Sequence, residues 1–370
     1  MTSPHRPTLD QRIKTTLTED GGHIPVVLGL CGTGRSAVLR RVQQELGADR
    51  CQYVNVERTA TTPERFLDAL VSGSPFRDSR PASRPTSPRQ AFDAILAFLS
   101  GARRSDQGRA TFLLDEVLEF RTFESFPGLR RALPEMLAVI ASTPNRFVLT
   151  SRYVSRTERI LATSSPQFVM VPVHGLGADE IAAMLHETRT TGTTGFDRAP
   201  AAGGPIDTVS RVIQRLSDGR TVYARALTDM IARMESHGGT DPVAALAALL
   251  EPDGRLSLVC GFYYELRLHR ARGYGALKAI LGILSQKEPL TLTEISQRLG
   301  RTPGSTKDYL SWLEDVDLVA VNQKRYRFRD PLLRVWVRLH CRATQPTTQE
   351  ITAEVQQYAA ACLPELVTAP

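Results

Sequence analysis

The first half of the chain alternates short apolar runs with segments of helical periodicity. The runs lie at Ile24–Gly29, Cys51–Glu57, Thr111–Asp115, Arg146–Ser151 and Gln167–Val173. Each is rich in Val, Ile, Leu or Phe and is apolar almost throughout, a pattern typical of strands covered on both faces. Because helical patterns separate the runs, we expect an α/β domain with a parallel sheet, helices on both of its faces and right-handed crossovers.

The pattern becomes helical after Ile206. Three helices are predicted at 206–219, 221–236 and 241–250, the last with Asp241 as its cap and Pro242 in its first position. They indicate a small helical domain. Two stretches rich in Pro, Gly, Ser and Thr, Ser72–Arg89 and Thr188–Pro205, have no period, and we expect them to be mobile surface loops.

A linker helix at 254–272 precedes three further helices and a hairpin. The second of these helices opens with Thr291 and Glu294 at the spacing of a capping box. The third runs to about Val316, and the segments "LVAVN" and "YRFRD", joined by "QKR", predict a two-stranded wing. The side chains of the third helix that are expected to face inward are Tyr309, Leu310, Trp312 and Leu313. The whole pattern is that of a winged helix-turn-helix.

These patterns divide the chain into four segments, as expected for 370 residues, which exceed the usual size of a single core. We expect an α/β domain at 1–187, a lid-like helical domain at 206–253, the linker helix with the winged helix at 254–345, and a C-terminal helical tail at 346–370.

The composition is that of a soluble protein, with 42% hydrophobic and 23% charged residues and no apolar run long enough to span a bilayer. The N-terminus has no apolar core of the kind that a signal peptide carries. The five cysteines are scattered and form no CxxC pair, which favours reduced thiols. We therefore expect a cytoplasmic protein with no membrane partner.

The stretch "GLCGTGRS", Gly29 to Ser36, has the spacing of a phosphate-binding loop between a strand and a helix. Its glycines would let backbone N–H groups surround phosphate oxygens, and the Ser36 hydroxyl would be a ligand of Mg²⁺. The usual lysine is replaced by Arg35, which keeps the charge but is longer, planar and bidentate. The chain has 41 arginines and only five lysines. Arg35 leaves open whether a bound nucleotide is hydrolysed.

A second motif decides between two nucleotide sites. The loop alone also matches a dinucleotide fingerprint, Gly32-x-Gly34-x-x-Ala37, with Glu57 where a ribose-binding acid would lie. The run "TFLLDE", however, ends in Asp115 and Glu116, which can hold Mg²⁺ and polarise a water molecule. Hydride transfer needs no such pair, so the phosphate-loop interpretation is favoured. A glycine turn and strand-end acids that bind nothing are the third interpretation.

Polar residues also follow the strand predicted beside the Asp115 strand, namely Thr150, Ser151 and Arg152 in "LTSRY". With "GLCGTGRS", "TFLLDE", the helical domain and the winged helix, the chain resembles the STAND branch of the AAA+ P-loop ATPases. Its layout is similar to that of the archaeal-type prokaryotic ATPases and their Orc/Cdc6-like relatives. The resemblance implies a P-loop sheet, a lid and a terminal winged helix.

The resemblance also implies ligands and residue roles. ATP and Mg²⁺ are the implied cofactors, with Ser36 and Asp115 at the metal, Asp115 and Glu116 as the catalytic acids, and Glu116 as the base. Thr150, Ser151 and Arg152 would sense the γ-phosphate. The implied nucleotide-binding residues of the loop are Gly29, Gly32, Thr33, Gly34, Arg35, Ser36 and Ala37.

The positive charge of the chain lies in its C-terminal part. The formal net charge is +7, and residues 255–345 alone hold sixteen Lys and Arg against eight Asp and Glu. Such a local excess is the electrostatic footprint of a nucleic-acid-binding module. We expect double-stranded DNA as a partner, contacted from the third helix and the wing. The outward residues predicted for this contact are Arg301, Ser305, Thr306, Lys307, Ser311, Lys324, Arg325 and Arg327.

Two functions stay open from the sequence. One is an ATP-binding switch that couples nucleotide state to DNA binding or assembly, with self-association or a partner protein involved. The other is a non-hydrolysing DNA-binding or protein-docking adaptor with a degenerate nucleotide site. Asp308, Glu314 and Asp315 place acid on the third helix, which suits protein docking.

Overall fold

The computed structural model describes residues 7–18, 22–76, 84–191, 206–235, 239–269 and 273–364. Their internal contacts group them into two compact units. One contains the described residues up to Leu30 together with Gly34–Val173, and the other contains Cys31–Thr33 and the residues from His174 onward. The first unit ends before residue 187 because helix α8 (Ala178–Thr191) packs on two helices of the second unit.

The first unit is built on a parallel sheet of five strands, as the apolar runs predict. The strands are β1 (Ile24–Leu28), β2 (Cys51–Asn55), β3 (Thr111–Asp115), β4 (Arg146–Ser151) and β5 (Phe168–Pro172). Their order is β2-β3-β4-β1-β5. All four pairings are parallel. The second strand ends earlier than the apolar run, because Val56 and Glu57 begin a short helix.

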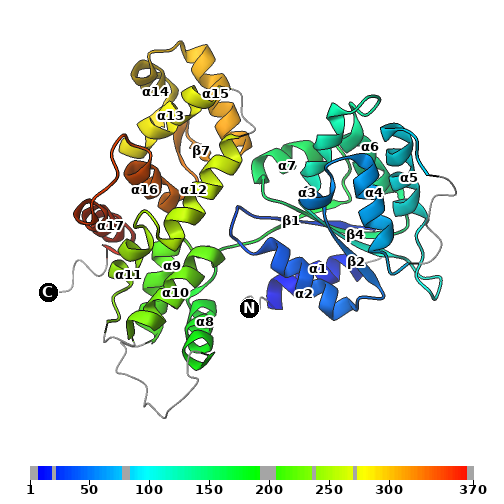
Figure 1. Cartoon of the computed structure of the whole chain (residues 1–370), viewed down its shortest axis with the longest axis horizontal. Helices are drawn as coiled ribbons and strands as arrows, with labels where there is room; N and C mark the ends of the chain where they lie inside the picture. Colours follow the sequence, from blue (N-terminus) through cyan, green and yellow to red (C-terminus); the bar gives the residue numbers. More distant parts are fainter. Residues whose placement is uncertain are drawn as a thin grey trace. The chain divides into compact units, whose positions relative to one another are not determined.

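Helices cover both faces of this sheet (Figure 1). They are α1 (Pro7–Thr18), α2 (Arg35–Leu46), α3 (Val56–Thr59), α4 (Pro63–Ser72), α5 (Pro88–Gly101), η1 (Val117–Ser125), α6 (Ala132–Ser142) and α7 (Val154–Leu161). On one face α1 and α2 pack Ile13 and Leu39 onto Val27 and Val148. On the other face Phe112 contacts Phe147 and further phenylalanines. Because successive strand side chains alternate between faces, the sheet has a hydrophobic core on each side.

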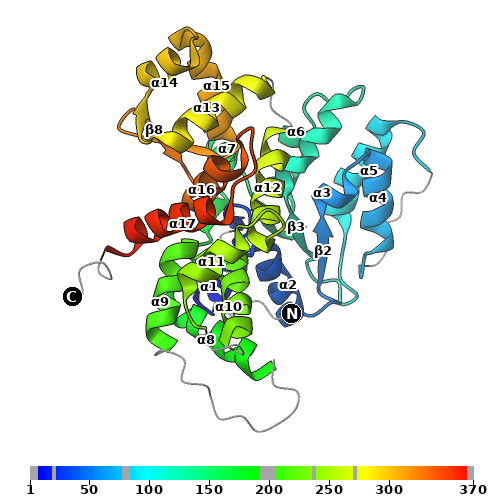
Figure 2. The ribbon, with the colours of Figure 1, turned by 60° about the vertical axis from the view of Figure 1, so that its left-hand side comes forward.

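The second unit contains the helical domain and the winged helix (Figure 2). Its helices after α8 are α9 (Ile206–Ser217), α10 (Thr221–Glu235), α11 (Pro242–Leu249), α12 (Arg255–Leu268), α13 (Tyr274–Gln286), α14 (Leu292–Leu299), α15 (Pro303–Asp315), α16 (Pro331–His340) and α17 (Thr348–Cys362). A small antiparallel sheet has the order β6 (Leu290–Thr291), β8 (Arg325–Phe328), β7 (Val319–Asn322). The predicted Asp241 cap and the Thr291–Glu294 capping box are both present.

Much of each predicted mobile loop lies outside the described residues, which omit 77–83 and 192–205. The described parts include helical residues at both ends of the first stretch and at the start of the second. Helix α4 ends at Ser72, α5 begins at Pro88, and α8 extends to Thr191.

A buried carboxylate joins the helical domain to the winged helix inside the second unit. Asp330 is 2% exposed and caps α16, where it accepts a hydrogen bond from the Leu333 N–H at 3.1 Å. The Tyr223 hydroxyl of α10 donates to Asp330 at 2.9 Å, and Arg220 Nη1 lies 3.2 Å from the same oxygen. Arg220 also donates to the Arg329 carbonyl at 3.1 Å. Residues from both sequence domains therefore share one buried polar cluster.

Candidate functional site

The candidate site lies at the carboxyl edge of the central strands of the first unit. Because parallel strands end at a common edge, β1, β3 and β4 bring three predicted motifs together. The loop from Gly29 follows β1. Asp115 ends β3 and Glu116 comes directly after it, while Thr150 and Ser151 end β4 and Arg152 comes directly after them. The middle of the loop, Cys31–Thr33, groups with the other unit.

The loop geometry explains its glycines. Gly32 has φ +80° and Gly34 has φ +91°, a left-handed backbone that L side chains rarely adopt. Gly34 is the N-cap of α2 and has no side chain to accept a hydrogen bond from the first turn. A helix N-terminus without a side-chain cap favours an anion, because the helix dipole and the N–H groups point toward it. Ser36 is half-buried in the first turn of α2, and the Ala37 N–H bonds to the Gly34 carbonyl.

Arg35 turns back toward the loop and toward Glu116, which follows β3. It is 7% exposed, and its Nη1 donates to the carbonyls of Gly29 and, at 2.5 Å, Leu30. Its Nη2 donates to Glu116 Oε1 at 2.6 Å. The residue that replaces the usual lysine is therefore paired with the residue expected to be the catalytic base. Sequence spacing gave no sign of this pair.

Glu116 is held by two guanidinium groups. It is 5% exposed, and its Oε2 accepts from the Arg152 N–H at 3.0 Å and lies 3.1 Å from Arg152 Nε. Burial raises the pKa of Glu116, but the charges of Arg35 and Arg152 outweigh it and lower the pKa below its usual range. Its φ of +62° is strained for a residue with a Cβ, as is common at functional sites.

Asp115 is fully buried and accepts two hydroxyl hydrogen bonds. Thr150 Oγ1 donates to its Oδ1 at 2.5 Å, and the Tyr53 hydroxyl donates to its Oδ2 at 2.7 Å. Burial and the Asp115 charge raise the pKa of Tyr53 to about 12, so Tyr53 keeps its proton at neutral pH. Tyr53 was missed in the sequence. Its one signal is a hydroxyl in the apolar run that pairs with the Asp115 strand.

Two further predicted residues have partners within the first unit. Arg152 is 6% exposed and forms an ion pair with Glu57, which lies in α3. Ser151 is fully buried and accepts from the Tyr153 N–H at 3.2 Å.

The strand order excludes the dinucleotide fold, because β3 and β4 lie between β2 and β1, whereas that fold places its first two strands side by side. Glu57 therefore does not occupy the ribose-binding position.

The winged helix presents most of the predicted DNA-binding residues to solvent. Arg301, Lys307, Ser311, Lys324, Arg325 and Arg327 are exposed and Ser305 is half-buried. The prediction that Thr306 faces outward is wrong, because Thr306 is fully buried and donates to the Thr302 carbonyl. The positions 306, 310 and 313 share one face of α15, and that spacing could have identified Thr306 as a core residue. Tyr309 and Trp312, expected to face inward, are half-buried.

The wing ends in a two-residue turn. Asn322 pairs with Arg325 across the hairpin, and the two residues between them, Gln323 and Lys324, both have positive φ. These dihedrals are those of a type I′ turn, which matches the twist of the flanking strands. Lys324 therefore lies at the tip. Arg325 is already close to protein groups, 3.8 Å from Glu294 and 3.4 Å from the Pro289 carbonyl.

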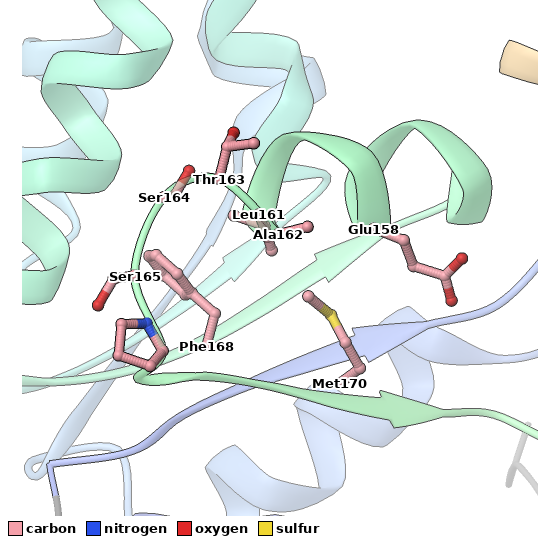
Figure 3. Close-up of a pocket in the computed structure, with 9 residues that line it drawn as sticks. Glu158, Leu161, Ala162, Thr163, Ser164, Ser165, Phe168 and Met170 are labelled. Carbon is pink, nitrogen blue, oxygen red and sulfur yellow. The ribbon is translucent and has the colours of Figure 1, made fainter.

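A separate hollow of about 480 Å³ lies beside the edge strand β5 (Figure 3). The end of α7, the loop 163–166 and the residues Phe168 and Met170 line it. None of the predicted nucleotide-binding residues does. The nucleotide interpretation therefore rests on the loop and the acid pair.

The five-stranded parallel sheet, the helices that follow it and the C-terminal winged helix form a fold that is similar to that of a Walker-type ATPase. In particular, it is similar to the Walker-type ATPase of Pyrococcus abyssi, with 18% identity and a TM-score of 0.64 over 90% of this chain and 96% of that one. The predicted resemblance is thus confirmed at the level of the fold. Assignment to the STAND branch stays a prediction.

Weaker likenesses include the Orc1 protein of Aeropyrum pernix in complex with DNA, at 17% identity, a TM-score of 0.45, and coverage of 98% and 94% of the two chains. Cdc6p of Pyrobaculum aerophilum has 12% identity and a TM-score of 0.44, with coverage of 97% and 94%. Residues 276–319 match the family of winged helix-turn-helix DNA-binding domains. No curated protein matches the chain. Among the described residues, no helix is long and apolar enough to cross a membrane.

Proposed function

We propose that the protein is an ATP-binding switch whose nucleotide state controls DNA binding or assembly through its winged helix. The observation that carries the proposal is the constellation at one sheet edge. The N-terminus of α2, capped by Gly34, and the Arg35 charge lie at the same sheet edge as Asp115, which ends β3, and Glu116, which follows it. The same elements in the same order are what ATP and Mg²⁺ require.

The residues fit this ligand by their chemistry. The glycine-capped helix end and two guanidinium groups favour a polyphosphate anion, and Asp115 and the Ser36 hydroxyl supply the oxygen ligands that Mg²⁺ prefers. Few protein ligands are needed, since Mg²⁺ in such sites also takes water and phosphate oxygens. Among the described residues, no group of three or more His, Cys, Asp and Glu offers a different metal site. Bound ATP would supply the phosphoanhydride bond that water cleaves.

The arrangement of Glu116 favours binding over rapid turnover. A general base must reach the water whose proton it takes. Both Glu116 oxygens here accept from arginine N–H groups, and its lowered pKa weakens it as a base. We therefore propose either a slow ATPase or a switch that binds nucleotide without hydrolysing it. The second of these corresponds to the non-hydrolysing adaptor that the sequence left open.

The winged helix would bind double-stranded DNA through the exposed cations of α15 and the wing. Supporting this are the family match of residues 276–319 and the charge excess of residues 255–345. In winged helices the third helix enters the major groove while the wing meets the backbone. Lys307 on α15 and Lys324 at the wing tip are exposed and would contact phosphates. Self-association or a partner protein would be the other output of the switch.

ATP binding is tested by thermal unfolding of the full chain with and without Mg²⁺ and ATP. At 100 times its Kd, ATP should stabilise the wild type by about 2.7 kcal/mol. Gly34→Ala should abolish this gain, because a Cβ at φ +91° costs roughly 1–2 kcal/mol and displaces the loop. Gly101→Ala is the matched control, since a Cβ there has no atom within 4 Å. An unchanged unfolding midpoint of the wild type at saturating ATP would contradict the proposal.

DNA binding is tested with Lys307→Ala and Lys324→Ala. Each should weaken duplex binding and reduce the slope of log K against log salt by about 1, because each removes one phosphate contact. Fluorescence anisotropy with a labelled duplex at several salt concentrations measures both effects. Arg65→Ala, an exposed site on α4, should leave the slope unchanged. Wild-type slopes in both winged-helix variants would favour the protein-docking alternative.

A further inference from the structure

Four charged side chains of the first unit form a continuous chain of alternating sign. Arg35 pairs with Glu116, Glu116 with Arg152, and Arg152 with Glu57. The first three are 7%, 5% and 6% exposed. This row of ion pairs runs from the phosphate loop across the ends of β3 and β4 to α3. Its formal charges cancel without any ligand.

Arg35 is the unusual member, because a lysine is expected at its position. Lysine is a compact point charge, whereas the guanidinium offers five N–H donors in a planar fork. Arg35 uses this fork in two directions. Nη1 donates to two loop carbonyls, and Nη2 donates to Glu116. One side chain thus fixes the start of the loop to the expected base.

We propose that Arg35 and Glu116 form a latch that a polyphosphate must open, so that Glu116 Oε1 is released only when nucleotide takes its place as the partner of Arg35. This inference rests on the proposed nucleotide-binding function. The geometry points to it because Nη1 of Arg35 is bound to two loop carbonyls and Nη2 is paired with Glu116, so a phosphate that takes Nη2 competes with the Glu116 carboxylate.

The ion pairs at the Arg152 and Glu57 end of this row keep Glu116 in place after the latch opens. Glu116 Oε2 has separate partners, the Arg152 N–H and Nε, and Glu57 holds the far side of the Arg152 guanidinium. Release of Oε1 therefore leaves the carboxylate anchored by Oε2. Glu57 is a positioning residue in this arrangement, acting through Arg152.

A latch lowers nucleotide affinity by a definite rule. The apparent Kd is the intrinsic Kd divided by the fraction of molecules with the latch open. Glu116→Gln removes the charge that holds Arg35 and keeps a carbonyl oxygen for Arg152. We expect Glu116→Gln to bind ADP, a non-hydrolysable ATP analogue and inorganic tripolyphosphate about tenfold more tightly than wild type, which is about 1.4 kcal/mol.

The titrations are done by calorimetry on the full chain without Mg²⁺, so that neither hydrolysis nor the metal contributes. Removal of any nearby negative charge could favour an anion through space, and Asp115→Asn is the comparison. Asp115 contacts Tyr53 and Thr150 rather than Arg35, so it should give no such gain. In an Arg35→Gln background the effect of Glu116→Gln should also vanish, because no latch is left to open.

The outcomes separate the latch from the proposed function. Tighter binding by Glu116→Gln but not by Asp115→Asn supports the latch. Equal gains in the two variants, or wild-type affinity in Glu116→Gln, overturn the latch while nucleotide binding stands. Failure of every protein, wild type included, to bind any of the three anions overturns both.

Discussion

Asp330→Ala is expected to destabilise the second unit by about 3–5 kcal/mol, the usual cost of breaking a buried ion pair from one side. The substitution leaves the charge of Arg220, which is 3% exposed, with the neutral Arg329 carbonyl and with Asp218, an exposed carboxylate 4.0 Å away. It also removes the acceptor of the Tyr223 hydroxyl and the cap of α16. The unfolding midpoint should fall by about 10 °C.

Tryptophan fluorescence measures this effect directly, because both tryptophans, Trp312 and Trp336, belong to the second unit. Asp308→Ala is the matched control, since Asp308 is exposed on α15. The unfolding midpoint of Asp330→Asn should lie between those of Asp330→Ala and Asp308→Ala, because an amide oxygen can still cap α16 but carries no charge to pair with Arg220. A midpoint within about 1 °C of wild type for Asp330→Ala would show that Arg220 finds another partner.

The expected loss has a functional consequence within the second unit. Arg220 and Tyr223 lie at the start of α10, whereas Asp330 begins the helix that follows the wing. Because these contacts are buried, α10 cannot move without either breaking them or moving α16 with it. The helical domain and the winged helix are therefore expected to move together when the proposed switch operates.

The sheet could be predicted from the sequence because its signal is local. Strands buried on both faces are continuous apolar runs, and their carboxyl ends share one edge in any parallel sheet. These two regularities alone place Asp115, Thr150 and the loop after β1 near one another. The order of the strands also agrees with the expectation that Arg146–Ser151 lies beside Thr111–Asp115.

The side-chain partners could not be predicted, because they depend on direction as well as position. Arg35 and Glu116 are 81 residues apart, and Tyr223 and Asp330 are 107 apart. Arg35 could have pointed away from Glu116 with the same backbone. Thr306 is different, since its helical spacing to Leu310 and Leu313 places it on the buried face of α15. A hydroxyl was assumed to face outward there, whereas a buried threonine can bond to the carbonyl of the preceding turn.

Asp115 is expected to have two separable roles, one structural and one in holding Mg²⁺. Asp115→Ala leaves two hydroxyls without their acceptor, that of the fully buried Thr150 and that of the half-buried Tyr53. Each unsatisfied group costs about 1–3 kcal/mol, so we expect a loss of roughly 3 kcal/mol or more, seen by calorimetry as a lower unfolding midpoint. Asp68→Ala, an exposed acid on α4, should be close to wild type.

Asp115→Asn separates these roles because the amide has nearly the same shape as the carboxylate. Its oxygen can accept from one hydroxyl and its NH₂ can donate to the other, so most of the stability should return. The negative charge that attracts Mg²⁺ is still absent. ATP titrations should therefore give Kd values at least about tenfold tighter with Mg²⁺ than without it for wild type, and the same Kd in both conditions for Asp115→Asn. If Mg²⁺ strengthens ATP binding equally in both proteins, Asp115 is only a hydrogen-bond acceptor in the core, and the metal ligand lies elsewhere.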